Sequence, residues 1–273
     1  MFTSMMPKVS VLIPLYNAED FIAETISAVL AQTFQDFELI LLDDNSSDNT
    51  QKVVASFGDD RILYKRNEQN LGISENRNKL VEMARGEYVA VLDHDDICLP
   101  ERLSVQVAFL DSHPEIAMVG SWFELKSLKK DPWWWRAVVD MGWVWKHPLT
   151  PQMKDLWHGN VMMHPTIMYR RKLFIENNIR YREEYTPAED YDLIKQAMQK
   201  GFKVYNIPQI LLRYTLYGGN CSLLQREKMR QVDRKIKREV AALLHKKYLF
   251  FYPYVLVMLQ KLRLKFLMRT KDV

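Results

Sequence analysis

Short apolar runs alternate with helical periodicity in the N-terminal part of the chain. Three apolar runs predict buried strands, at residues 9–13, 37–42 and 87–92, and residues 61–65 predict a further strand. Between them, apolar residues at helical spacing predict three helices, at about residues 17–32, 48–57 and 75–84. Asn17 is expected to cap the first of these helices. Strands and helices that alternate in this way are typical of a parallel sheet with helices on both faces.

The second half of the chain has a less regular pattern. It predicts helices at about residues 100–111, from about 171 and within 185–193, and strands at 116–125, 164–169 and 202–207. The regular pattern breaks between residues 126 and 160, and five of the seven tryptophans lie between 133 and 145. Because three adjacent tryptophans cannot all face one core, at least one of Trp133, Trp134 and Trp135 is expected to meet solvent, ligand or lipid.

The composition of the 273 residues is ordinary for a globular protein, with 48% hydrophobic and 26% charged residues. Two cysteines, Cys98 and Cys221, give neither a disulfide framework nor metal-ligand spacing. The first seven residues lack the charged start and the apolar stretch of a signal peptide. These features favour a reducing, cytoplasmic compartment.

Positive charge is concentrated toward the C-terminus. From residue 223 onward there are 14 Lys and Arg against 4 Asp and Glu, whereas the preceding residues hold 24 against 30. Residues 229–243 predict an amphipathic helix with a basic outer face, and the apolar run 249–259 is too short to span a bilayer. We expect residues 246–273 to lie on an anionic membrane surface, with a terminal helix docked on the core as the alternative. Nucleic acid is not expected as a partner, because the tail lacks interleaved base-stacking residues.

Three polar clusters follow predicted strands, at residues 14–17, 43–46 and 93–96. In parallel sheets, ligands bind beyond the carboxyl ends of the strands, where these clusters would meet. Three carboxylates, those of Asp93, Asp95 and Asp96, would raise each other's pKa, so we expect a divalent metal bound together with a phosphate-bearing substrate. A single Asp at a strand end would be ordinary loop chemistry. The sequence has no glycine-rich phosphate loop, so metal and side chains must hold any nucleotide phosphates.

Five stretches of the chain resemble, in order, the signatures of the family-2 glycosyltransferases. They are VSVLIPLYN at 9–17, LDDNSSDNT at 42–50, NLGISENRN at 70–78, LDHDD at 92–96 and ED at 189–190. Each motif alone is weak, but five in sequence are specific. The fourth resembles the metal-binding D-x-D element of that family.

The resemblance implies an α/β fold of the A type (GT-A), a single Rossmann-like domain with a mostly parallel central sheet and helices on both faces. The catalytic domain would cover residues 1–222, with a nucleotide-sugar-binding half at 8–120 and an acceptor-binding half at 121–222. The acceptor half would contain the Trp-rich insertion at 126–160. Residues 223–273 would form a basic, amphipathic, helical C-terminal extension.

The resemblance also implies residue roles. The nucleotide sugar would be bound by Pro14, Tyr16, Asn17, Asp44, Arg77, Asp93 and His94. Asp93 and Asp95 would hold a Mn²⁺ or Mg²⁺ at the diphosphate. Asp190 would be the general base that takes a proton from the acceptor hydroxyl in a single, inverting displacement. Further candidates for the site are Asp96, Glu189, His164 and Tyr217.

One stretch departs from the family pattern. Relatives commonly show Tyr-Arg-x-His before a Gly/Asn/Ser turn, whereas this chain has YTLY at 214–217 followed by GGN. Tyr217 therefore stands where a His that can approach the metal or the diphosphate is expected, and His164 is a candidate to replace that contact. The chain also lacks Q-x-x-R-W and a spanning helix, so one sugar per encounter is expected rather than processive synthesis.

The sequence thus predicts an inverting, metal-dependent glycosyltransferase. It would move one sugar from a nucleoside-diphosphate sugar, with a UDP-sugar favoured, to a glycan or lipid-linked acceptor in cell-surface polysaccharide synthesis. We expect it in the cytoplasm, peripheral at the inner face of the plasma membrane. Two alternatives stay open: a nucleotidyltransferase on a related fold, and a non-catalytic partner subunit that binds nucleotide sugars.

Overall fold

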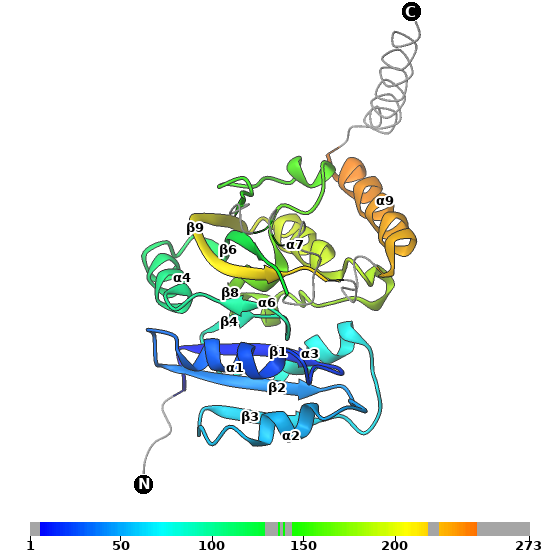
Figure 1. Ribbon diagram of the computed structural model, residues 1–273. Helices are drawn as coiled ribbons and strands as arrows, with labels where there is room; N and C mark the ends of the chain where they lie inside the picture. Colours follow the sequence, from blue (N-terminus) through cyan, green and yellow to red (C-terminus); the bar gives the residue numbers. More distant parts are fainter. Residues whose placement is uncertain (1–5, 129–135, 137–138, 140–143, 218–223, 245–273) are drawn as a thin grey trace, which may run out of the picture.

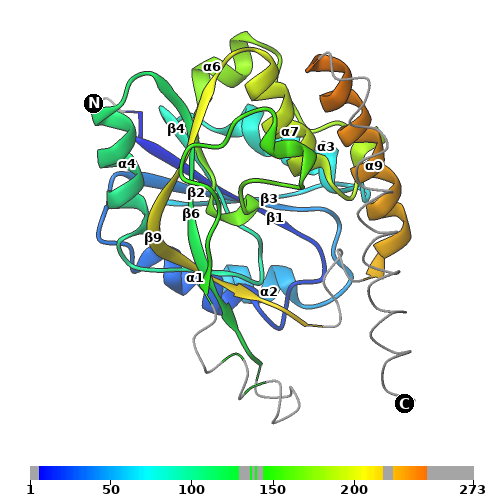
Figure 2. The same ribbon diagram turned by 90° about the horizontal axis from the view of Figure 1, so that it is seen from above.

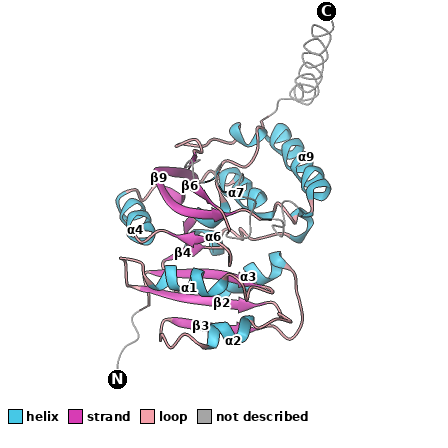
Figure 3. Cartoon of the chain, in the orientation of Figure 1, coloured by secondary structure: helices cyan, strands magenta, loops and turns pink. Residues whose placement is uncertain are grey.

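The computed structural model of the protein describes residues 6–128, 136, 139, 144–217 and 224–244. These residues form one nine-stranded sheet with helices packed against it (Figures 1 and 3). Within the described part of the chain, none of the helices has the length and apolar character that a membrane crossing needs.

The N-terminal half of the sheet is parallel, as predicted. It contains β1 (Val9–Leu15), β2 (Phe37–Asp43), β3 (Ile62–Arg66) and β4 (Tyr88–Val91), in the order β3-β2-β1-β4. The chain first winds outward from β1 to β3 and then returns to place β4 on the other side of β1. This reversal opens a crevice beyond the carboxyl ends of β1 and β4, the usual ligand site of such sheets.

The other half of the sheet is mixed. Its strands are β5 (Ile97–Cys98), β6 (Ile116–Lys126), β7 (Val144–Trp145), β8 (Met168–Arg170) and β9 (Lys203–Thr215). β8 lies antiparallel between β4 and β6, whereas β9 runs parallel to β6 and antiparallel to β5. The sheet order continues as β4-β8-β6-β9-β5, and β7 pairs with β6.

Helices cover both faces of the sheet, as predicted. One face packs against α1 (Ile22–Leu30), α2 (Thr50–Ala55) and α4 (Arg102–Ser112). The other packs against α3 (Ile73–Met83), α6 (Arg171–Glu176), α7 (Glu189–Gln199) and α9 (Arg226–Leu243). Successive residues of a strand point to opposite faces, so Val11 and Ile13 belong to the first core and Leu12 to the second.

Three short 3₁₀ helices complete the described fold: η1 (Asp155–Trp157), η2 (His164–Thr166) and η3 (Glu183–Tyr185). The strand expected at 164–169 was therefore partly wrong, because its first three residues form η2. Pro165 lacks the N–H that a sheet ladder needs, which explains why the strand begins only at Met168. The late strand expected at 202–207 continues instead to Thr215, across register shifts against β6.

The first helix also begins differently from the prediction. α1 starts at Ile22, and Asn17 does not cap it. Asn17 instead has a φ of 50° and its side-chain Oδ1 accepts hydrogen bonds from Ser47. A short polar side chain tolerates this left-handed conformation, so Asn17 turns the loop toward the end of β2 rather than starting a helix.

Part of the expected C-terminal extension packs on the sheet domain. The α9 side chains of Val232, Ile236 and Val240 are buried in the core that α7 also joins. Residues 245–273, with the apolar run 249–259 and the proposed membrane segment, lie outside the described residues. So do Trp133, Trp134, Trp135 and Trp143 of the Trp-rich insertion. Trp145 is 56% exposed and its ring is stacked with that of Phe123.

Candidate active site

A cavity of about 910 Å³ lies beyond the carboxyl ends of β1, β2 and β4. Its wall is built from loops that are far apart in sequence but end at the same sheet edge. Of the predicted site residues, all except Asp96 line it: Pro14, Tyr16, Asn17, Asp44, Arg77, Asp93, His94, Asp95, His164, Glu189, Asp190 and Tyr217.

Asp44 stabilises the loops at one end of this cavity through hydrogen bonds. Its Oδ1 accepts hydrogen bonds from the Asn67 amide group at 2.8 Å and from the Leu71 N–H at 2.9 Å. Its Oδ2 accepts a hydrogen bond from the Gly72 N–H at 2.9 Å. The buried carboxylate thus holds the loop before α3 against the end of β2, and its Oδ2, which accepts only one of these bonds, still has acceptor capacity.

The loop after β1 is held by the loop after β2. The Asn17 N–H donates to the Ser46 hydroxyl, and the Asn17 Oδ1 accepts from the Ser47 N–H, both at 2.9 Å. Asp43 in turn accepts hydrogen bonds from the backbone and side chain of Ser46. These contacts fix the neighbouring Tyr16, whose side chain lines the cavity and is 50% exposed.

Arg77 of α3 joins two acidic segments across the cavity. Its Nη2 donates to Asp93 Oδ1 at 2.8 Å, and its Nη1 donates to Glu189 Oε1. Burial acts to raise the pKa of Asp93, but the Arg77 guanidinium beside it holds that pKa below the usual range. The pKa of Glu189 is raised by burial, although Arg77 opposes the shift. Arg77 therefore ties the end of β4 to the start of α7.

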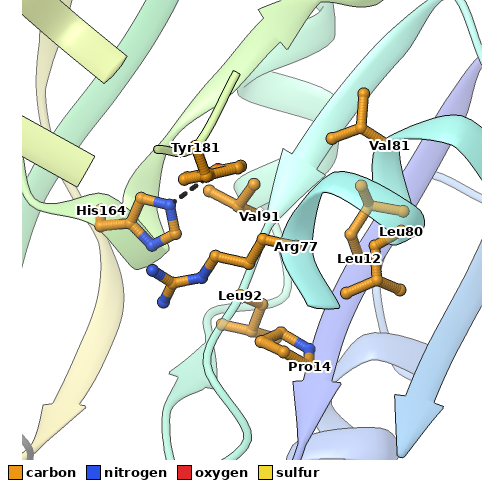
Figure 4. Close-up of a pocket in the computed structure, with 9 residues that line it drawn as sticks. All are labelled: Leu12, Pro14, Arg77, Leu80, Val81, Val91, Leu92, His164 and Tyr181. Carbon is orange, nitrogen blue, oxygen red and sulfur yellow. Dashed lines mark hydrogen bonds between the residues drawn. The ribbon is translucent and has the colours of Figure 1, made fainter. Parts of the chain in front are cut away.

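A second, much smaller pocket lies behind Arg77 (Figure 4). Its volume is about 10 Å³, which leaves room for no more than about one water molecule. The guanidinium points toward His164, whose Nε2 is hydrogen-bonded to the Tyr181 hydroxyl at 2.9 Å. Burial lowers the pKa of His164 to about 3, so the imidazole is neutral at physiological pH. Its Nδ1 lies 3.9 Å from Asp93 Oδ1.

Tyr217 reaches Asp95, the second predicted metal ligand. The Tyr217 hydroxyl donates a hydrogen bond to the Asp95 carboxylate. Burial and the nearby Asp93 raise the pKa of Asp95. The Tyr217 ring centroid lies 4.8 Å from that of Phe21, which also faces His94. The residue that departs from the family pattern thus occupies the position beside the D-x-D acids.

Asp96 lies behind the cavity rather than in its wall. It is fully buried, and its Oδ1 accepts a hydrogen bond from the Thr215 N–H at 2.8 Å. Burial and the carboxylates of Asp95 and Asp93 raise its pKa well above the usual value. Its contacts join the acidic loop to the end of β9, which differs from the direct site role that the sequence suggested.

Asp190 lies at the start of α7. Its Oδ2 accepts a hydrogen bond from the Asn160 amide group at 2.8 Å. Burial and the neighbouring Glu189 raise its pKa to about 7. A carboxylate whose pKa lies near neutral can accept a proton efficiently at physiological pH, which is the property of a general base.

The family model described as "Glycosyl transferase family 2" matches residues 10–177, more than half of the chain. The chain belongs to glycosyltransferase family 2. It is an enzyme of that class, as the sequence predicted, and membership argues against the nucleotidyltransferase and the non-catalytic subunit that the sequence left open.

Similar proteins agree with this assignment. An uncharacterized glycosyltransferase of Haemophilus influenzae is 30% identical over 239 residues, covering 85% of this chain and 73% of the relative. The Escherichia coli protein WfaP, a UDP-Glc:α-D-GlcNAc-diphosphoundecaprenol β-1,3-glucosyltransferase, is 28% identical over 80% of each chain. S. aureus TarS, solved with UDP-GlcNAc, superposes with a TM-score of 0.68 at 23% identity, covering 89% of this chain and 73% of that chain. This likeness shows the GT-A fold.

The acidic end of this glycosyltransferase cavity fits a divalent metal only with help from a substrate. Among the residues described, no three His, Cys, Asp or Glu side chains converge as a ligand set. Asp93 and Asp95 provide two carboxylates in the cavity wall, and burial together with the like charge of Asp93 raises the pKa of Asp95. Mg²⁺ is usually held by one or two carboxylates together with substrate phosphates. The residues present fit that arrangement.

Several residues that line the cavity or support its wall were not predicted from the sequence. Asn67 and Asn160 support Asp44 and Asp190, and no sequence pattern distinguishes them from other loop asparagines. Gln225, Lys228 and Met229, at the start of α9, also line the cavity. Their basic helix was recognisable, but its contact with the site was not. Of the described lining residues, six are acids and only Arg77 and Lys228 carry a fixed positive charge.

Proposed function

We propose that this glycosyltransferase moves a single sugar from a UDP-sugar to a hydroxyl of a lipid-linked glycan, with inversion, in the synthesis of cell-surface polysaccharide. One observation carries the proposal: the same cavity wall contains the acidic pair Asp93 and Asp95 and the carboxylate of Asp190, whose pKa is raised to about 7. The activity of WfaP supports the choice of donor and acceptor, and TarS with UDP-GlcNAc is a further precedent for the donor.

The nucleotide would bind at the end of the cavity formed by β1 and β2. Tyr16 offers an exposed aromatic face on which a base can stack. Asp44 offers its Oδ2, which can accept a further hydrogen bond from the base N–H, and its position is held by Asn67 and the loop before α3. Pro14 and Arg77 would contact the base and ribose, with Asn17 and His94 beside them.

Asp93 and Asp95 would hold a Mn²⁺ or Mg²⁺ at the diphosphate. Bound there, the ion would neutralise charge that develops on the leaving nucleoside diphosphate. Arg77 keeps Asp93 ionised through their ion pair, and the hydrogen bond from the Tyr217 hydroxyl favours the ionised form of Asp95 against the effect of burial, which raises its pKa.

Asp190 would act on the acceptor. As the acceptor oxygen bonds to the anomeric carbon, the bond from that carbon to the diphosphate oxygen breaks and its electron pair leaves with the diphosphate. The hydroxyl proton moves to the Asp190 carboxylate, which its raised pKa favours. One displacement inverts the anomeric centre, so a single base suffices and no covalent nucleophile is required.

The enzyme would work in the cytoplasm, at the inner face of the plasma membrane, where a lipid-linked acceptor presents its sugar. Residues 246–273, rich in positive charge and apolar side chains, remain our proposed membrane segment.

Substitutions at Asp190 and at Asp95 test this function. A panel of nucleotide sugars would first identify the donor by metal-dependent hydrolysis. Asp190→Asn should then lower the rate of sugar transfer by about 10²–10⁴-fold, the usual contribution of a general base. Calorimetry should show that it still binds the nucleoside diphosphate, whereas Asp95→Asn should lose metal-dependent binding. Asp60→Asn, an exposed carboxylate far from the cavity wall, is the matched control. Transfer by Asp190→Asn at the parent rate would contradict the assignment of the base.

A further inference from the structure

Arginines recur at every fourth position along α9. Arg226, Arg230, Arg234 and Arg238, here called the arginine row, are all exposed. Residues four apart lie on the same side of a helix, so the row is continuous. Helical geometry puts it opposite the face that buries Val232, Ile236 and Val240. Figures 1 and 2 show α9 at an outer edge of the molecule, so the row faces away from the core.

The acids of α9 only partly neutralise this row. The helix carries seven Lys and Arg against three acids. Asp233 pairs with Lys237 at 2.9 Å, and Glu239 is engaged by the buried Lys195. Glu227 approaches the row, at 3.7 Å from both Arg230 and Arg234. The outer face of α9 is therefore a strip of net positive charge on a rigid helix.

We propose that the arginine row docks α9 on an anionic lipid bilayer. A negative surface complements a row of exposed cations on one side of a helix, and guanidinium groups bind phosphate oxygens in pairs. Leu224, just before the row, is 70% exposed and offers an apolar side chain at the same end. An exposed leucine suits the lipid interface better than a nucleic-acid backbone.

The row begins at the rim of the cavity. Gln225, Lys228 and Met229, from the residue before α9 and from its first turn, line the cavity wall. A bilayer bound along the row would therefore lie beside the cavity whose wall also contains Asp190. This consequence rests on the proposed function, because it requires a lipid-linked acceptor. Docking would then bring the acceptor sugar to the base without extracting the lipid from the membrane.

Vesicle binding by the full chain tests the docking surface. The row variant combines Arg226→Gln, Arg230→Gln, Arg234→Gln and Arg238→Gln. The control removes the same charge at four exposed lysines elsewhere, with Lys65→Gln, Lys154→Gln, Lys200→Gln and Lys203→Gln. On phosphatidylglycerol-containing vesicles, the row variant should lose at least about 100-fold in partition coefficient, from contributions of about fivefold per arginine. The control should change by less than about threefold, and Glu227→Gln should bind about fivefold more tightly.

Enzyme assays separate the docking surface from the proposed function. The row variant should hydrolyse the donor and transfer sugar to a short, water-soluble acceptor at the parent rate, but should be slow on an acceptor embedded in vesicles. Equal vesicle binding by the row and control variants would overturn the proposal, as would row-dependent binding to an oligonucleotide as tight as that to vesicles. The parent could also transfer no sugar with any donor, while the row variant still loses the vesicle binding that the parent has. That result would support the docking surface and count against the proposed function.

Discussion

At the scale of single residues, the site separates its carboxylates by their environments. Asp93 lies beside Arg77, which holds its pKa below the usual range, whereas burial and Glu189 raise the pKa of Asp190 to about 7. Titratable groups whose pKa values the protein shifts in opposite directions commonly have different chemical roles. An anionic Asp93 suits a metal, and an Asp190 that can take up a proton suits a base.

We predict that the pH profile of the sugar-transfer rate has an acidic limb governed by the ionisation of Asp190. A base with a pKa of about 7 is ionised above that pH and protonated below it, so the rate should fall as pH falls through about 7. Asn160→Asp would place a second carboxylate where an amide now lies 2.8 Å from Asp190 Oδ2. The like charge should move the limb upward by roughly one pH unit or more, in a profile of kcat against pH.

Asn160→Ala is the companion variant. It removes the amide hydrogen bond without adding charge, so its limb should move less than that of Asn160→Asp. A limb that stays in place in Asn160→Asp would mean that another group is the base.

At the scale of elements, close contact between backbones fixes how α3 leads into β4. Gly86 lies between them, and its N–H donates to the Ser10 hydroxyl of β1 at 2.8 Å. Ser10 also donates to Glu38 of β2 at 2.6 Å. A Cβ added at Gly86 would lie 2.6 Å from the Ser10 backbone nitrogen, closer than real Cβ atoms approach backbone. The parallel register of three strands thus depends on a residue without a side chain.

We therefore predict that Gly86→Ala destabilises the protein. The strands would have to separate to admit the methyl group, and the free energy of unfolding should fall by about 1–3 kcal/mol, as in other overpacked sites. Gly58→Ala is the matched control, because nothing lies within 4 Å of a Cβ at that position. Its free energy of unfolding should change by no more than about 1 kcal/mol. Denaturant titration of both variants would check this, and equal stabilities would contradict the contact argument.

At the scale of the whole molecule, α9 joins the catalytic domain through its core and through charge. Lys195 of α7 is almost fully buried and pairs with Asp192 at 2.9 Å and with Glu239 of α9. Tyr185 also donates to Glu239, at 2.7 Å. These groups, together with the buried apolar side chains of α9, make the helix a structural part of the domain as well as a wall of the cavity.

We predict that Ile236→Ala lowers the stability of the entire domain. The side chain is 0% exposed, so its truncation should lower the free energy of unfolding by about 2–5 kcal/mol. Because α9 shares a core with α7, fluorescence and circular dichroism should report one common transition. Leu243→Ala, at a position that is 39% exposed, is the control and should have a much smaller effect. An unchanged main transition in Ile236→Ala would show that α9 unfolds independently.

The sequence by itself determined the local elements and many of the polar residues of the cavity wall. Apolar runs located β1, β2 and β4 because a strand buried on both faces needs continuous apolar residues, and the motifs supplied twelve residues of one cavity. The fold class and the enzyme class followed from the same motifs, because residues that contact a common substrate keep their order and chemistry.

Tertiary structure alone decided which neighbours each of these residues has. Asp95 and Asp96 are adjacent, yet only Asp95 lines the cavity, while Asp96 is buried and bonded to Thr215. Nothing local indicates that β8 enters antiparallel between β4 and β6, that Asn160 supports Asp190, or that α9 reaches the site. Sequence periodicity records which side of an element is apolar, whereas pKa values and cavity walls depend on contacts between segments far apart in the chain, such as that of Asp96 with Thr215, 119 residues apart.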